Sequence, residues 1–252
     1  PPSGLDQYKF GFEMPWYIGF LAAGASSLLF AIITGWPTLR LRGEYLALTT
    51  FAFAEVFHSF LLNERRIGNG SVGLANIDRP DFSAIGLDES YGFMLSAVIL
   101  LVLTALLCRR LLASPYGRAI DAIRDDEIAA EAIGKDVQQL RFQVFLISAL
   151  PIGFAGALYA MLTTLVSPDL FTAEVTFFVW IALVLGGEHT IRGAIIGTLA
   201  LVGFEEFVRT IHFETVRGAE IAASVEHMMT GVIFVMILRW QPFTRFGKGS
   251  VS

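Results

Sequence analysis

Residues 114–136 read SPYGRAIDAIRDDEIAAEAIGKD, a charged stretch inside an otherwise apolar chain. Ser114 is a suitable helix N-cap, and Pro115 suits the first helical position, where a missing N–H costs nothing. Gly134 suits the left-handed residue that closes a helix. The stretch therefore predicts a single helix of about five turns.

Two uncharged segments, residues 91–108 and 142–167, lie on either side of this stretch. Each is long and apolar enough to be a membrane span, so we expect the charged helix to lie outside the bilayer, against one of its faces. Such a helix is a natural docking surface for a soluble partner. The alternative is an ordinary solvated loop between two spans.

Composition predicts an all-α, polytopic integral membrane protein. Hydrophobic residues make up 54% of the 252 residues and charged residues only 16%, with a mean hydropathy of +0.62. A soluble domain would carry about a quarter charged residues. The one cysteine, Cys108, excludes an internal disulfide and a cysteine-based zinc site, and the four histidines lack metal-binding spacing. We therefore predict no metal site and no cofactor in this chain.

Seven apolar segments are expected to cross or enter the membrane. They are residues 16–35, 45–62, 91–108, 142–167, 175–187, 193–213 and 221–238. Pro151 should bend the fourth segment or lie near a packing contact. The fifth is too short to cross upright, rising only about 20 Å, so it predicts a half-helix or a strongly tilted one. We expect residues 1–252 to form one transmembrane domain that lacks further N-terminal spans.

Orientation follows from the basic residues. With the segments alternating sides, twelve of the 18 Lys and Arg residues fall on the side of residues 114–136. The positive-inside rule then places that stretch and the C-terminus in the cytoplasm. Small residues at three- and four-residue spacings, Gly153, Gly156 and Ala157 and again Gly193 and Gly197, predict close helix packing.

Four stretches resemble the permease subunits of branched-chain amino-acid ATP-binding-cassette importers. They are residues 39–55 (LRLRGEYLALTTFAFAE), 70–74 (GSVGL), 118–134 (RAIDAIRDDEIAAEAIG) and 186–197 (GGEHTIRGAIIG), in the family's order. The similarity covers about residues 16–242. Departures are Ile128, where the wider superfamily has Glu, and His189 and Ala194, where the family usually has Gly and Pro.

The resemblance implies half of a translocation pathway in the bacterial inner membrane, with branched-chain amino acids as cargo; urea or short amides are the alternative. It implies a related second permease, two cytoplasmic ATPase subunits that hold the ATP, and an extracytoplasmic substrate-binding protein, with lipid around the chain and no nucleic acid. No phosphate-binding loop motif occurs, so the chain is not expected to be an enzyme. The ATPase-coupling residues would be Arg118, Asp121, Arg124, Asp125, Glu127, Ala130 and Gly134.

Within the charged helix, one broad stripe should contain Ile120 and Ile123 with Ala119 and Ala130 nearby. We expect this stripe to face a cleft or the protein's own underside. The charged flank, which includes Asp121, Arg124, Asp125 and Glu131, should then face the partner.

Five residues are expected to line the substrate path: Thr49, Thr50, Glu55, Gly186 and Gly187. A carboxylate inside a span usually faces a cavity or a partner charge, although Glu55 could instead pair with His58 near the outer interface. The two threonines could bind a substrate carboxylate or bond back to their own helix. A second class of function is a membrane-embedded enzyme that uses Glu55 and His58, or Glu188 and His189.

Overall fold

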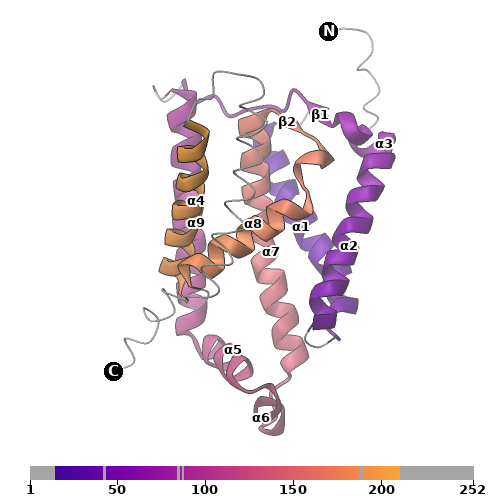
Figure 1. Ribbon diagram of the computed structural model, residues 1–252, viewed down its shortest axis with the longest axis vertical. Helices are drawn as coiled ribbons and strands as arrows, with labels where there is room; N and C mark the ends of the chain where they lie inside the picture. Colours follow the sequence, from indigo (N-terminus) through magenta and orange to yellow (C-terminus); the bar gives the residue numbers. More distant parts are fainter. Residues whose placement is uncertain (1–14, 42–43, 84–85, 87, 188–189, 211–252) are drawn as a thin grey trace. The chain divides into compact units, whose positions relative to one another are not determined.

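The computed structural model describes residues 15–41, 44–83, 86, 88–187 and 190–210, which are mainly helical (Figure 1). The elements in chain order are α1 (Trp16–Thr38), α2 (Glu44–Asn63), α3 (Arg65–Gly68), the 3-10 helix η1 (Gly70–Val72), β1 (Leu74–Ala75), α4 (Glu89–Ala113), α5 (Pro115–Asp125), α6 (Glu127–Ala132), α7 (Val137–Thr163), β2 (Leu165–Val166), the 3-10 helix η3 (Pro168–Leu170), α8 (Ala173–Gly186) and α9 (Ile191–Thr210). They fall into two compact units, Pro1–Phe171 and Thr172–Ser252.

In the first unit the four long helices α1, α2, α4 and α7 run alternately in opposite directions (Figure 1). Their lengths of 20 to 27 residues confirm the first four predicted segments as helices. One end of this unit carries α5 and α6, and the opposite end carries α3 and the short β1–β2 pair. Pro151 lies inside α7, which continues through it beside the packing contact of Gly153 with α1.

Among the described residues, five stretches are long and apolar enough to cross a membrane: four are the long helices and the fifth is Pro168–Gly186. The α-helix within that fifth stretch, α8, has only 14 residues and ends at Gly186, as the short-helix prediction requires. The predicted sixth segment is the helix α9, whose charged residues keep it out of this group. The predicted seventh, residues 221–238, lies outside the described residues.

Helices α1 and α7 pack closely because glycines on each helix leave room for atoms of the other helix. Gly24 lies against Phe154, whose ring stacks on Phe20 at 4.8 Å between centroids. Ser27 donates its hydroxyl hydrogen to the carbonyl of Ala149, with 2.9 Å between the oxygens. Gly153 leaves room for that serine, since a methyl group there would overlap the hydroxyl.

In the second unit, α8 and α9 meet backbone to backbone. A methyl group on Gly186 would overlap the carbonyl of Gly193, and one on Gly197 would overlap the carbonyl of Ala182. The predicted small-residue contact at Gly193 and Gly197 is therefore present, and it joins these two helices. Ala182 and Leu201 are each only 2% exposed at this contact.

At the end of the first unit opposite α5 and α6, two loops are tied together. Strand β1 pairs antiparallel with β2, and the hydroxyl of Ser167 donates to the carbonyl of Ser71 at 3.1 Å. Gly73 has a φ of +74° and lies against the backbone of Val166, so a side chain is excluded there on both grounds. The GSVGL stretch thus forms a fixed turn held by the segment that follows α7.

We predict that Gly153→Ala destabilises the protein by roughly 1–3 kcal/mol, because the added methyl overlaps Ser27 and the backbone of Ala23. Gly156→Ala is the matched control on the same helix. No atom of the described chain outside that helix lies within 4 Å of the methyl it would add, so it should be neutral or slightly stabilising. Thermal unfolding of the full-length protein in detergent measures both variants. Equal midpoints for the two would contradict the packing described.

Candidate functional site

The charged stretch of residues 114–136, here called the elbow, forms two helices and not the single helix predicted. Helix α5 ends at Asp125 and α6 begins at Glu127, with Asp126 between them in an extended conformation (φ −154°, ψ 106°). The carboxylate of Asp126 accepts the backbone N–H groups of Ile128 and Ala129, each at 3.0 Å. These bonds satisfy the free donors of a new helix, so the chain can turn here at little cost.

The predicted start of the elbow is confirmed. The hydroxyl of Ser114 accepts the backbone N–H of Gly117 at 3.4 Å, and Pro115 occupies the first helical position. Gly117 is pressed against the backbone of Leu112 at the end of α4, where a side chain would not fit. Helix α5 is therefore joined to α4 by a short, closely packed turn.

The predicted end is confirmed as well. Gly134 has a φ of +83°, in the left-handed region. Its N–H bonds the carbonyl of Glu131 at 2.9 Å, and the N–H of Lys135 bonds the carbonyl of Ala130 at 3.1 Å. Those two bonds give partners to two of the carbonyls in the last turn of α6. Asp136 then caps α7 by accepting the N–H of Gln139 at 2.9 Å.

An ion pair fastens α6 to α7. Arg141 Nη2 lies 2.7 Å from Glu127 Oε2, and the two side chains are only 29% and 25% exposed. Ala130, on α6, is 2% exposed. Two of the predicted coupling residues are therefore largely covered by the protein itself: Glu127 pairs with Arg141 of α7, and Ala130 is buried. Both help to hold the elbow in place. Arg141 was not predicted from the sequence, because nothing local links residues fourteen positions apart.

The charged flank of α5 is exposed, as expected. Arg124 lies 3.5 Å from a carboxylate oxygen of Asp121 and 3.5 Å from one of Asp125, with more than half of the arginine side chain exposed. Ile120 and Ile123 are half-buried on the same helix. The helix therefore presents a chain of alternating charges to the outside.

Two large apolar side chains of the elbow are exposed, and neither was predicted to be so from the sequence. Ile128 is 75% exposed and Ile133 is 73% exposed. Ile128 lies on the short helix α6, and Ile133 directly follows that helix. The sequence held a usable signal, because Asp126 is a favoured N-cap residue and a new helix can begin directly after it. The faces of such a helix differ from those of one long helix.

Tyr116, in the first turn of α5, has a covered hydroxyl without a hydrogen-bond partner among the described residues. Burial raises the pKa of Tyr116 above its ordinary value of 10.0. The side chain therefore stays a neutral phenol at physiological pH and adds no charge where α5 leaves α4.

Three of the residues predicted for the substrate path, Thr49, Thr50 and Glu55, lie on α2. Thr49 donates to the carbonyl of Tyr45 at 2.7 Å, and Thr50 donates to carbonyls one turn earlier in α2. Both hydroxyls thus bond back to their own helix. Glu55 Oε1 lies 4.0 Å from His58 Nδ1, and the glutamate side chain is 58% exposed. The proposed inward-facing role of Glu55 stays a prediction.

His58 also links α2 to the 3-10 helix η3, since its Nε2 lies 3.0 Å from the carbonyl oxygen of Pro168. Gly186 and Gly187 end α8 in the second unit, and Gly187 has a φ of +94°. Glu188 and His189 lie outside the described residues. Within the described ranges, no group of three His, Cys, Asp or Glu side chains is placed to hold a metal ion.

Residues 7–238 match the family described as "Branched-chain amino acid transport system / permease component". The chain is 33% identical over 247 residues to the "High-affinity branched-chain amino acid transport system permease protein LivM" of Escherichia coli (strain K12), covering 89% of this chain and 54% of that protein. It is 27% identical over 212 residues to the "Probable branched-chain amino acid transport permease protein LivM" of Methanocaldococcus jannaschii, covering 82% of this chain and 61% of that protein. The chain thus spans little more than half the length of these curated relatives. No solved structure matches it.

We predict a measurable coupling between Glu127 and Arg141 in a double-mutant cycle with Glu127→Gln and Arg141→Gln. Because the pair is short and mostly covered, its coupling should be about 1 kcal/mol. Asp121 and Arg124 serve as the control pair, since they are about half exposed and should couple by only about 0.3 kcal/mol. Thermal unfolding of the four forms of each pair gives the two values. Additive losses at Glu127 and Arg141 would show that this ion pair does not fasten the elbow.

Proposed function

Because the chain belongs to the family of permease components of branched-chain amino acid transport systems, we propose that it forms half of a membrane pathway for branched-chain amino acids. The family and the five long apolar stretches make it a multi-pass membrane protein. The family predicted from the sequence is thereby confirmed. The transported substrate, the partner subunits and the energy source are part of the proposal.

The observation that carries the proposal is the elbow. It lies at one end of the first unit, between the two apolar helices α4 and α7 (Figure 1). Its outer surface combines the charges around Arg124 with the exposed side chains of Ile128 and Ile133. Apolar anchors surrounded by charged groups are typical of a surface that binds another protein. The partner is a cytoplasmic ATPase subunit, which supplies the energy that this chain does not.

The internal bonds of the elbow explain how a partner's motion would reach the membrane. Helix α5 is packed on the end of α4 through Gly117, and α6 is fastened to α7 through Glu127 and Arg141. A force on the elbow is therefore transmitted to the ends of two long helices. Closing of the ATPase pair on ATP would move α4 and α7 and open the pathway to one side.

The remaining parts of the assembly are inferred from the family. A related second permease completes the pathway, a second ATPase subunit binds beneath it, and an extracytoplasmic protein delivers the substrate. The excess of basic residues on the side of the elbow supports a cytoplasmic elbow in the bacterial inner membrane. The tied loops of residues 70–74 and 165–170 would then face the delivering protein.

We predict that the reconstituted assembly hydrolyses ATP faster when its binding protein carries leucine, isoleucine or valine than when that protein is empty. Phosphate release in liposomes measures this, together with uptake of the radiolabelled amino acid. Stimulation by urea or short amides, with none by branched-chain amino acids, would assign the chain to another cargo. Activity of the lone chain, without any ATPase, would contradict the transport proposal.

In the same assay, Gly134→Val should insert and assemble but lose most uptake per ATP hydrolysed. Valine is strained at a φ of +83°, by about 1–2 kcal/mol, so the end of α6 would shift. Gly134→Asn is the matched control, because asparagine adopts the left-handed region more readily and no described atom would crowd its Cβ. Normal coupling in Gly134→Val would show that the geometry of the elbow is not required for transport.

A further inference from the structure

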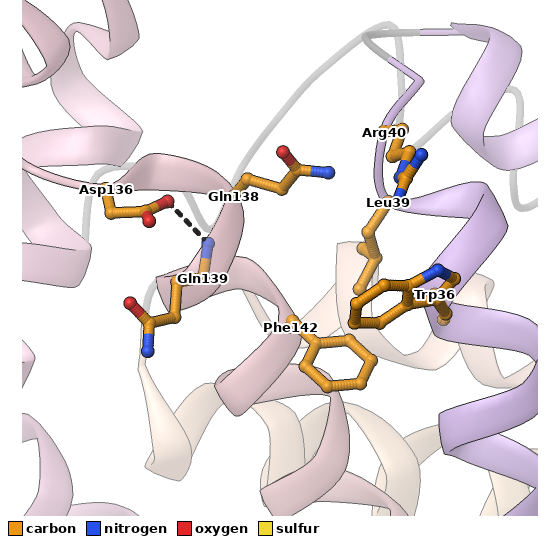
Figure 2. Close-up of a pocket in the computed structure, with 8 residues that line it drawn as sticks. Trp36, Leu39, Arg40, Asp136, Gln138, Gln139 and Phe142 are labelled. Carbon is orange, nitrogen blue, oxygen red and sulfur yellow. Dashed lines mark hydrogen bonds between the residues drawn. The ribbon is translucent and has the colours of Figure 1, made fainter.

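A pocket of about 470 Å³ lies between the end of α1 and the start of α7, at the same end of the unit as the elbow (Figure 2). It has an apolar wall and a polar rim. Trp36, Leu39 and Phe142 form the wall, and the rings of Trp36 and Phe142 meet edge to face at 6.1 Å between centroids. None of these residues takes part in the substrate path or the elbow surface.

Opposite charges stand on the two sides of this pocket. The guanidinium of Arg40 lies 5.4 Å above the Trp36 ring, which holds the cation at the rim. Asp136 lies on the far side, where its carboxylate accepts the backbone N–H of Gln139 (Figure 2). The two described side chains form no ion pair with each other. The amide of Gln138 reaches from α7 toward the side of Arg40.

The position of the pocket fits the boundary between hydrocarbon and water. Trp36 is in the last turn of the apolar helix α1, and its side chain is 62% exposed. Tryptophan and arginine at the end of a span are typical of the headgroup level of a bilayer. An apolar wall that opens beside a polar rim at this level suits an amphiphile whose tail continues into the lipid.

We propose that this pocket binds a zwitterionic phospholipid, with the phosphate on Arg40 and the headgroup ammonium on Asp136. The amide of Gln138 is placed to donate to a phosphate or ester oxygen, and the glycerol and upper acyl chains lie along Trp36 and Phe142. One positive and one negative group select a headgroup that carries both charges. An anionic headgroup without an ammonium group would leave Asp136 facing a like charge. Lipid binding here requires only that the chain crosses a membrane, so it does not depend on the transported substrate.

The test is native mass spectrometry of the full-length permease in its assembly, with phosphatidylethanolamine or phosphatidylglycerol added to the detergent. The wild-type protein should retain phosphatidylethanolamine in preference. Arg40→Gln should lower its retention about fivefold, the effect of one cation near a headgroup. Arg110→Gln, an exposed arginine in the last turn of α4, is the matched control and should change nothing.

Asp136→Asn separates headgroup selection from helix capping, because asparagine still caps a helix but carries no charge. This variant should lose phosphatidylethanolamine and gain phosphatidylglycerol, while its thermal midpoint stays that of the wild type. Equal retention of both lipids in wild type and Asp136→Asn would mean annular lipid only and would overturn the proposal. Displacement of the lipid by free leucine would overturn it too, because the pocket would then be a site for amino acids. The proposal would also be overturned if the Arg40→Gln variant retained as much phosphatidylethanolamine as the wild-type protein.

Discussion

Backbone hydrogen bonding at the elbow is the constraint on which the rest of the arrangement depends. Between α4 and α7 the chain stops and restarts its helix more than once, and each stop leaves polar groups that need partners. The side chains of Ser114, Asp126 and Asp136 accept backbone N–H groups in the first turns of α5, α6 and α7, and the turn at Gly134 gives partners to the carbonyls of Glu131 and Ala130. The elbow is therefore a defined structure, held by its own bonds, and not a flexible link between two spans.

This local order has a consequence for the long helices. The elbow is fastened to α7 by Glu127 and Arg141, and α7 is packed on α1 through Gly153 and Ser27. These contacts form a continuous connection from the elbow to the long helices. Protein interiors that are closely packed transmit strain. In the proposed transporter, the same contacts that stabilise the fold also carry the work of the ATPase into the membrane.

The sequence predicted what depends on local chemistry and missed what depends on distant residues. Ser114 with Pro115, and Gly134, marked the two ends of the elbow, and the four longest spans followed from length and apolar composition. The break at Asp126 was missed because the residues on both sides of it favour a helix, and cap signals were recognised only at Ser114 and Gly134. The ion pair of Glu127 and Arg141 forms because the chain turns back between α6 and α7, and the spacing of apolar residues in the sequence does not predict that turn. The pocket beside Trp36 joins residues about a hundred positions apart, so only the packing of α1 on α7 reveals it.

Cross-linking of the elbow to the ATPase subunit measures the proposed docking most directly. With Cys108 replaced by serine, a thiol cross-linker is attached at Ile128→Cys in one protein and, as the control, at Val72→Cys in another. Val72 is 66% exposed in the turn at the opposite end of the unit. We predict a covalent adduct between the permease and its ATPase from position 128 and none from position 72. An adduct from position 72 alone would place the ATPase on the other side of the membrane and contradict docking at the elbow.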